Sequence, residues 1–403
     1  MPTRIASDRY TSIDYARMRE YRLTRTKKMM EERGLGTLVT FEPWDIRYIT
    51  GSYVPPAVKW PEGVFVVLPR NGEPHMYSFS PYSLRAEMPW MNDRIWSQLG
   101  ITKLLFTVEA WDPYMDRIEG IIRDHGLANE TVGIDGSSSE LLLAEAFKRR
   151  GLEVVDAKEC MFKARMIKNE DEINCIRASC AMAEAAFYDI EQALRPGVAE
   201  CGLMGVGMKK LYELGADEVF EFVVASGPRT NPIRIDCTDR LIRPGEVVFV
   251  DINGSSFQGY KCCYYRSFCC GKATQEMKDT FHEAKDMMYD AMAMIRAGNT
   301  TGDICNTFPD SPSYWGYELW EDTSPFAVGH GIGLSLHEFP LFSRPGNGGN
   351  ALLEEGMVLA VETWCGKKGG SFGIRLEENV VVRKDGYELL TYYPINELIE
   401  CGI

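Results

Sequence analysis

The chain has 403 residues, of which 45% are hydrophobic and 25% are charged, a composition typical of a globular protein with a large core. Its formal net charge of −14, with no basic tract, excludes nucleic acid and membrane surfaces as expected partners. We expect no secretory leader, because residues 1–10 are polar, and no run of about 18 apolar residues occurs. We therefore expect a cytoplasmic protein whose 12 cysteines are mostly free, buried thiols.

Helical and strand patterns alternate over the first part of the chain. A charged amphipathic helix is expected over residues 13–34, and strands are expected at 37–41, 63–69 and 131–135. Helical patterns lie near 111–126 and 138–150, and Asp45–Gly51 leads into a turn. This alternation predicts a small α/β domain over residues 1–158.

The pattern changes near residue 158, where a second domain, 159–403, is expected to begin. A long helix should start at Asn169 and end before Arg195-Pro196-Gly197, and a second helix should follow over 201–214. Strand-rich sequence at 219–225, 246–253 and 259–270 precedes a Met-rich helix over 275–297. The remainder consists of strands and turns that carry the candidate site.

A candidate site begins at Gly329–Pro340, which contains His330 and His337, two of only five histidines in the chain. Three glycines surround the first histidine, and glycine lets backbone approach a ligand closely. The alternative is a glycine-rich turn before a strand, with two incidental histidines. Two apolar strands follow, each with a glutamate, Glu362 and Glu377. A buried carboxylate is costly unless it is paired or binds a metal, so the combination favours a site.

An expected hairpin adds further polar groups. Asp251 and Asn253 lie two residues apart near the end of an apolar strand, so they point to the same face. Cys263 lies on the returning strand, on the same side as Tyr265 and Ser267. The hairpin is therefore expected to present Asp251, Asn253 and Cys263 together.

This order of groups resembles the creatinase, aminopeptidase P and methionine aminopeptidase superfamily. Asp45–Gly51 and Ala164–Lys168 also match its two-domain members. Arg17–Leu23, Ala225–Pro232 and Gly369–Glu377 are similar to the dimethylsulfoniopropionate lyases of this fold. The resemblance covers essentially the whole chain. It implies an α+β protein with a pita-bread catalytic domain after a smaller α/β creatinase-type domain.

The resemblance also implies a metal site with altered ligands. Metal-dependent members supply two aspartates, one histidine and two glutamates; here Asn253 or, after a shift of two residues, Asp251 takes the first aspartate position, and Cys263 takes the second. We expect one divalent ion, Fe or Zn, with a metal-free site as in creatinase as the alternative. The candidate ligands are Asp251, Asn253, Cys263, His330, Glu362 and Glu377.

The catalytic residues implied by the resemblance are His337, His330 and Glu362, with His337 as general acid or base. The histidine that peptidases carry after the Ala-Ser-Gly segment is replaced by Ile233 and Arg234. For Arg229 and Arg375, two candidate substrate-binding residues, the alternative is a solvated or ion-paired position on the surface. In two-domain members of the family, the N-terminal domain of one subunit approaches the active site of the partner subunit, and the resemblance implies this for the segment Asp45–Gly51. The alternative is that this segment serves only its own domain. The candidate substrate-binding residues are Arg229, Arg375, Tyr260, Arg47 and Tyr48, the last two across a homodimer interface.

The implied function is cleavage of a C–S or C–N bond in a small zwitterionic substrate by a lyase or hydrolase. An Xaa-Pro dipeptidase or aminopeptidase is one alternative, against which the altered metal positions argue. A non-catalytic binding protein on the same fold is another. Retention of His330, His337, Glu362 and Glu377 argues against it, because a pocket without chemistry has no need of costly polar groups.

Overall fold

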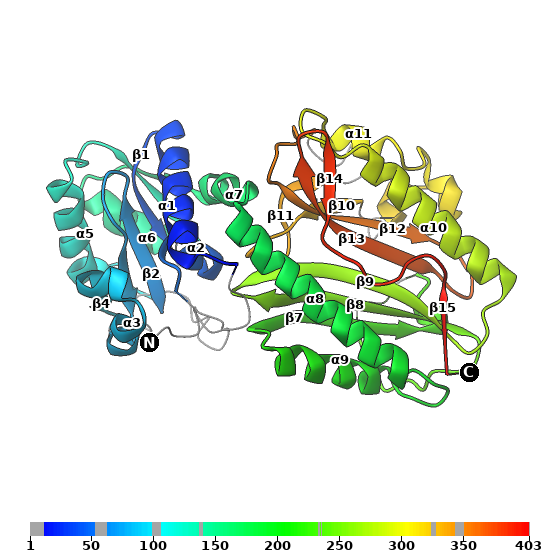
Figure 1. Cartoon of the computed structure of the whole chain (residues 1–403). Coiled ribbons are helices and arrows are strands. Elements are labelled where there is room, and N and C mark those ends of the chain that lie inside the picture. Colours follow the sequence, from blue (N-terminus) through cyan, green and yellow to red (C-terminus); the bar gives the residue numbers. More distant parts are fainter. Residues whose placement is uncertain are drawn as a thin grey trace. The chain divides into compact units, whose positions relative to one another are not determined.

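The chain forms two compact units, Met1–Arg165 and Met166–Ile403. The computed structural model, drawn in Figure 1, describes residues 12–52, 63–98, 106–136, 140–232, 234, 236–323, 328–342 and 350–402. The division falls inside helix α7 (Lys158–Met166), a few residues after the predicted boundary near 158. No helix in these ranges is both long and apolar enough to cross a membrane.

The first unit is built on a six-stranded sheet with the order β4-β3-β2-β1-β5-β6. Strand β1 is antiparallel to β2 and parallel to β5, in agreement with the predicted α/β pattern. The segment Asp45–Gly51 is helical and ends at Gly51 in the left-handed conformation, where glycine has no steric penalty. The elements are α1 Tyr15–Glu32, β1 Leu35–Thr40, α2 Pro43–Thr50, β2 Val64–Pro69, β3 His75–Ser78, α3 Pro81–Glu87, β4 Ile95–Ser97, α5 Asp112–Asp124, β5 Thr131–Asp135, α6 Glu140–Arg149 and β6 Val154–Asp156.

The second unit contains two sheets, ordered β11-β10-β12-β13-β14 and β15-β9-β8-β7. Helix α8 lies across β8 and β9, α9 packs near β7, and α10 packs on β12 and β13 (Figure 1). The elements are α8 Glu170–Ala193, α9 Glu200–Leu214, β7 Glu218–Ser226, β8 Glu246–Phe257, β9 Tyr260–Cys270, α10 Gln275–Ala293, α11 Thr301–Cys305, β10 Gly329–Gly331, β11 Glu338–Phe342, β12 Val358–Cys365, β13 Ile374–Arg383, β14 Gly386–Leu389 and β15 Ile399–Cys401.

Gly329–Gly331 does not form the glycine-rich turn of the alternative interpretation, because it is strand β10, between β11 and β12. A Cβ on Gly329 would lie 2.3 Å from the carbonyl oxygen of Ala360 and 2.4 Å from the ring of Phe342. Glycine is therefore required for close packing of the neighbouring strands, and not for a tight turn.

Strands β9 and β13 come from different sheets and are joined by buried side chains. The amide of Asn379 on β13 accepts a hydrogen bond from the backbone N–H of Cys263 (3.2 Å) and donates one to its carbonyl. Arg266 on β9 donates to the carbonyl of Glu377 (2.6 Å) and to the carboxylate of Glu378 (2.7 Å). These bonds fix the strand of Cys263 against the strand of Glu377.

We predict that Asn379→Leu lowers the free energy of unfolding by about 2–5 kcal/mol, because two buried backbone groups of Cys263 lose their partner. Strand β15 pairs with β9 only at Phe268–Cys270, so it supplies no substitute partner for Cys263. Urea unfolding should show the loss at an unchanged denaturant slope. The exposed Asn396→Leu is the matched control, expected to change stability by less than about 0.5 kcal/mol. Equal stabilities for the two variants would contradict the prediction.

Candidate metal centre and active site

Three buried side chains from three strands converge in the second unit. Donor atoms of Cys263 on β9, His330 on β10 and Glu377 on β13 all lie within 4.8 Å of one another. The Nε2 of His330 is 4.0 Å from Oε1 of Glu377. Neither this nitrogen nor either oxygen of Glu377 makes a hydrogen bond within the described residues. Buried polar atoms without partners are rare, so the arrangement fits a bound cation.

The pKa shifts of the cluster also fit a bound cation. Burial lowers the pKa of His330 to about 4, so its imidazole is neutral near pH 7. Its Nδ1 lies 2.8 Å from the Gly331 carbonyl, which places the proton there and leaves the Nε2 lone pair for a ligand. Burial also raises the pKa of the Cys263 thiol and of the Glu377 carboxyl, the latter further because of nearby carboxylates. A divalent cation would offset the cost of ionising both groups.

The chemistry of the three donors fits Zn or Fe. Thiolate and imidazole are ligands that these metals prefer, and a carboxylate completes the set. Three protein ligands with an open position are typical of catalytic zinc sites, whereas structural sites have four. Cys263, His330 and Glu377 were all among the predicted ligands, and the structure brings these three together.

The hairpin of β8 and β9 brings Asp251 and Asn253 to the edge of this cluster. Asn253 lies opposite Cys263 in the strand register, and Asp251 lies opposite Tyr265. The Asn253 amide accepts a hydrogen bond from the Cys263 thiol (2.7 Å) and donates one to Asp251 (2.9 Å). Burial raises the pKa of Asp251, whose second oxygen makes no hydrogen bond among the described residues. Asn253 thus links Cys263, one of the three candidate donors, to Asp251, which lies beside them.

Glu362 is held by other side chains. It lies directly opposite Glu377 in the pairing of β12 and β13. Its Oε2 accepts hydrogen bonds from Arg375 (2.5 Å) and from the hydroxyl of Tyr265, and Arg375 also donates to Tyr265 (2.9 Å). Arg375, a predicted substrate-binding residue, therefore binds Glu362. Tyr265 was not predicted as a site residue, although strand alternation placed it on the face of Cys263.

His337, the predicted proton-transfer residue, lies next to His330. The ring centroids are 4.4 Å apart and the planes are inclined by 60°. His330 is buried, whereas His337 is exposed. A candidate metal ligand and a solvent-accessible imidazole thus lie side by side, an arrangement that suits proton transfer to a substrate bound there.

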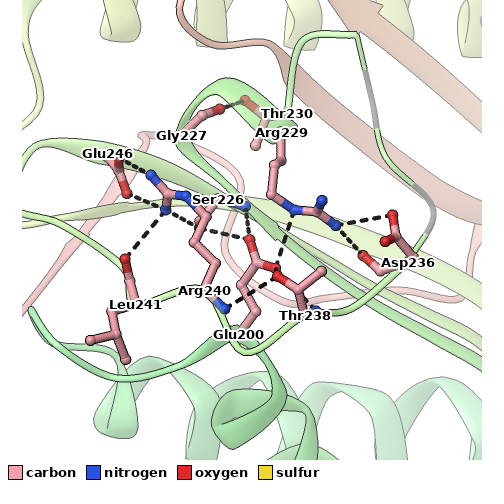
Figure 2. Close-up of polar contacts among 10 residues, drawn as sticks. All are labelled: Glu200, Ser226, Gly227, Arg229, Thr230, Asp236, Thr238, Arg240, Leu241 and Glu246. Carbon is pink, nitrogen blue, oxygen red and sulfur yellow. Dashed lines mark hydrogen bonds and ion pairs between the residues drawn. The ribbon is translucent and has the colours of Figure 1, made fainter.

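Arg229 lies in a separate ionic cluster, shown in Figure 2, in which its guanidinium points between two carboxylates. Its Nε is 3.3 Å from Glu200, and its Nη2 donates to Asp236 (3.0 Å). The buried Glu200 also accepts hydrogen bonds from the backbone and hydroxyl of Ser226, 2.8 Å each. The ion-paired alternative describes Arg229 better than the predicted substrate-binding role. Ile233 lies outside the described residues.

The remaining predicted substrate-binding residues have structural contacts. Tyr260 donates its hydroxyl proton to Glu172 on α8 (2.5 Å), so its assignment to the substrate site is corrected to a role in the core. Tyr48 donates to the carbonyl of Ala164 (2.8 Å) within the first unit. Arg47 is half-buried on α2. A role for Arg47 or Tyr48 at a dimer interface stays a prediction.

Family comparisons agree with this architecture. The Metallopeptidase family M24 matches residues 174–384, and the Creatinase/Prolidase N-terminal domain matches residues 22–167. The chain belongs to metallopeptidase family M24. The predicted fold class is confirmed: a creatinase-type α/β domain precedes an α+β pita-bread domain.

Individual relatives of the M24 chain include enzymes of two kinds. It is 27% identical over 404 residues to the dimethylsulfoniopropionate lyase DddP of Roseovarius nubinhibens, covering 95% of this chain and 87% of the relative. It is 26% identical to the probable dipeptidase PepE of Mycobacterium bovis, covering 98% and 99%. The structure of an Xaa-Pro dipeptidase from Bacillus anthracis has a TM-score of 0.76 at 22% identity and covers 94% and 99%.

We predict that protein purified without chelator contains about one Zn or Fe per chain and that Cys263→Ala loses it. Elemental analysis measures the content. Reconstitution with Co²⁺ should give a thiolate charge-transfer band in the wild type that the variant lacks. Cys262→Ala, whose thiol lies on the opposite face of β9, is the control and should keep both properties. Full metal content in Cys263→Ala would contradict the proposed ligand set.

Proposed function

We propose that this chain is a metal-assisted lyase or hydrolase that cleaves a C–S or C–N bond in a small zwitterionic substrate. The convergence of donor atoms from Cys263, His330 and Glu377 beside the exposed His337 carries the proposal, since the Nε2 of His330 and both Glu377 oxygens have no hydrogen-bond partner among the described residues. The relationship to a dimethylsulfoniopropionate lyase over 95% of the chain supports a sulfonium compound as the first substrate to test.

The surrounding charges support a substrate with a cationic group. Glu221 approaches the Asn253 amide (3.4 Å), and Asp251 lies beside it, so carboxylates line this side of the cluster. Arg375 is paired with Glu362 and Arg229 with Glu200, so these guanidinium groups are already neutralised. A site with an excess of carboxylates attracts a sulfonium or ammonium group.

The site residues divide the work of an elimination. A divalent ion held by Cys263, His330 and Glu377 would supply Lewis-acid chemistry toward a substrate carboxylate or carbonyl. The His337 imidazole accepts the proton from the carbon next to the substrate carboxylate. The C–H electron pair then forms the C=C bond, and the neutral sulfide or amine departs with the electrons of the broken bond. In hydrolysis the same imidazole takes a proton from water.

An Xaa-Pro dipeptidase is the second candidate. The adjacent His337 and Glu338 match the pattern of the peptidases, and the chain spans 99% of the mycobacterial dipeptidase relative. A non-catalytic binding protein is the third candidate. An exposed imidazole beside a buried donor set favours catalysis over binding alone.

We predict that the metal-loaded enzyme releases dimethyl sulfide from dimethylsulfoniopropionate and that His337→Gln lowers kcat/KM by about 10²–10⁴-fold, because the proton acceptor is lost. Gas chromatography of the headspace measures release. His282→Gln, which changes a surface histidine paired with Glu397, should leave the rate unchanged.

Cleavage of glycyl-proline without sulfide release would instead favour the dipeptidase. Absence of cleavage of sulfonium, N-methyl and guanidino compounds at high enzyme loading would refute the proposal. An active enzyme whose rate does not respond to His337→Gln would remove the role of this histidine.

A further inference from the structure

The loop Gly333–Glu338, which presents His337, is wrapped around a buried carboxylate. Glu338 is 1% exposed, and its Oε1 accepts a hydrogen bond from the backbone N–H of Ser335 (3.0 Å). A Cβ on Gly333 would lie 2.6 Å from Oε2 of Glu338, so a side chain there would displace the carboxylate from its present position. The position of His337 therefore depends on how the Glu338 carboxylate is held.

A buried lysine holds that carboxylate. The Nζ of Lys168 lies 2.9 Å from Oε2 of Glu338, and both side chains are almost completely inaccessible. The backbone of Lys168 is itself fixed, because its N–H donates to the carbonyl of Gly356 (2.9 Å). The cost of removing two charges from water roughly cancels the attraction of a buried ion pair, so stability alone does not account for it. What the Lys168–Glu338 pair provides instead is a fixed geometry for the loop Gly333–Glu338.

A second buried lysine holds the other end of the loop. Lys261 on β9 donates from Nζ to the carbonyl of Leu334 (3.1 Å) and from its backbone N–H to the carbonyl of Gly333 (2.8 Å). Lys261 is 1% exposed and lies two residues before Cys263, on the same face of the strand. The strand that supplies a candidate metal ligand thus also fixes the loop of His337.

We propose that Lys168 and Lys261 are positioning residues that hold the His337 imidazole against His330. Lys261 fixes the beginning of the loop and Lys168 fixes its end, with His337 directly before Glu338. Both act through the loop and do not touch substrate. This inference rests on the proposed role of His337 in proton transfer.

The first test requires no substrate. Imidazole ¹⁵N NMR is recorded for metal-loaded Lys168→Met and Lys261→Met, with ring signals assigned from histidine variants. The His337 and His330 signals should shift or broaden, while that of His125 in the first unit should stay in place. Lys272→Met, which removes an exposed lysine paired with Glu400, is the control and should leave all the signals unchanged.

Loss of one partner leaves a buried charge uncompensated, so Lys168→Met alone can unfold the protein. The double variant Lys168→Met/Glu338→Gln removes both charges while it keeps an acceptor for Ser335, and it serves as the second form of the test. Unmoved His337 and His330 signals in the folded lysine variants would overturn the inference, whatever the activity of the enzyme.

The second test uses the proposed reaction. Misplacement of the imidazole should lower kcat by up to about 100-fold with KM little changed, because the interaction is made in the transition state. A purely structural role would leave kcat per folded, metal-loaded chain at its wild-type value and would overturn the inference. If shifted NMR signals accompany an inactive wild type, the positioning stands and the proposed function fails.

Discussion

The contact between β9 and β13 is the constraint on which the rest of the site depends. These strands belong to different sheets, so no ladder of backbone hydrogen bonds joins them. The Asn379 amide and the buried Arg266 guanidinium supply the bonds instead. The structure pays a desolvation cost to bury these polar groups, and the many acceptors around Arg266 offset it. The result is that Cys263 and Glu377 face each other across two sheets.

The distribution of charge within the site follows from which carboxylates already have partners. Arg375 and Tyr265 bind Glu362 through short, charge-assisted hydrogen bonds. An amide at position 253 can donate to one neighbour and accept from another, so Asn253 joins Asp251 to Cys263. A carboxylate at that position could still accept from the Cys263 thiol, but it could not donate to Asp251 and would add a further acidic group beside it. Asn253 and Cys263, at the positions where metal-dependent relatives have aspartates, therefore suit one cation held by three donors better than a cluster of two metal ions.

The sequence predicted the elements well because their causes are local. A capping box at Asn169 starts α8, and glutamates within apolar strands predicted the candidate site because buried carboxylates are costly. The choice of partner was not predictable. Tyr260 bonds to Glu172 and Arg229 to Glu200, and each pair joins residues far apart in the chain. The sequence shows that such a side chain needs a partner, and only the fold decides which partner is near.

Alternation along β9 couples the parts of the site. Lys261, Cys263 and Tyr265 lie on one face, and they contact the His337 loop, the donor cluster and Glu362, respectively. A slip of one residue in the pairing of β9 would turn all three side chains to the opposite face. The Asn379 amide binds both backbone groups of Cys263, the middle residue, and so opposes such a slip. The same contact that joins the sheets therefore also keeps the metal donors and the proton-transfer loop in register.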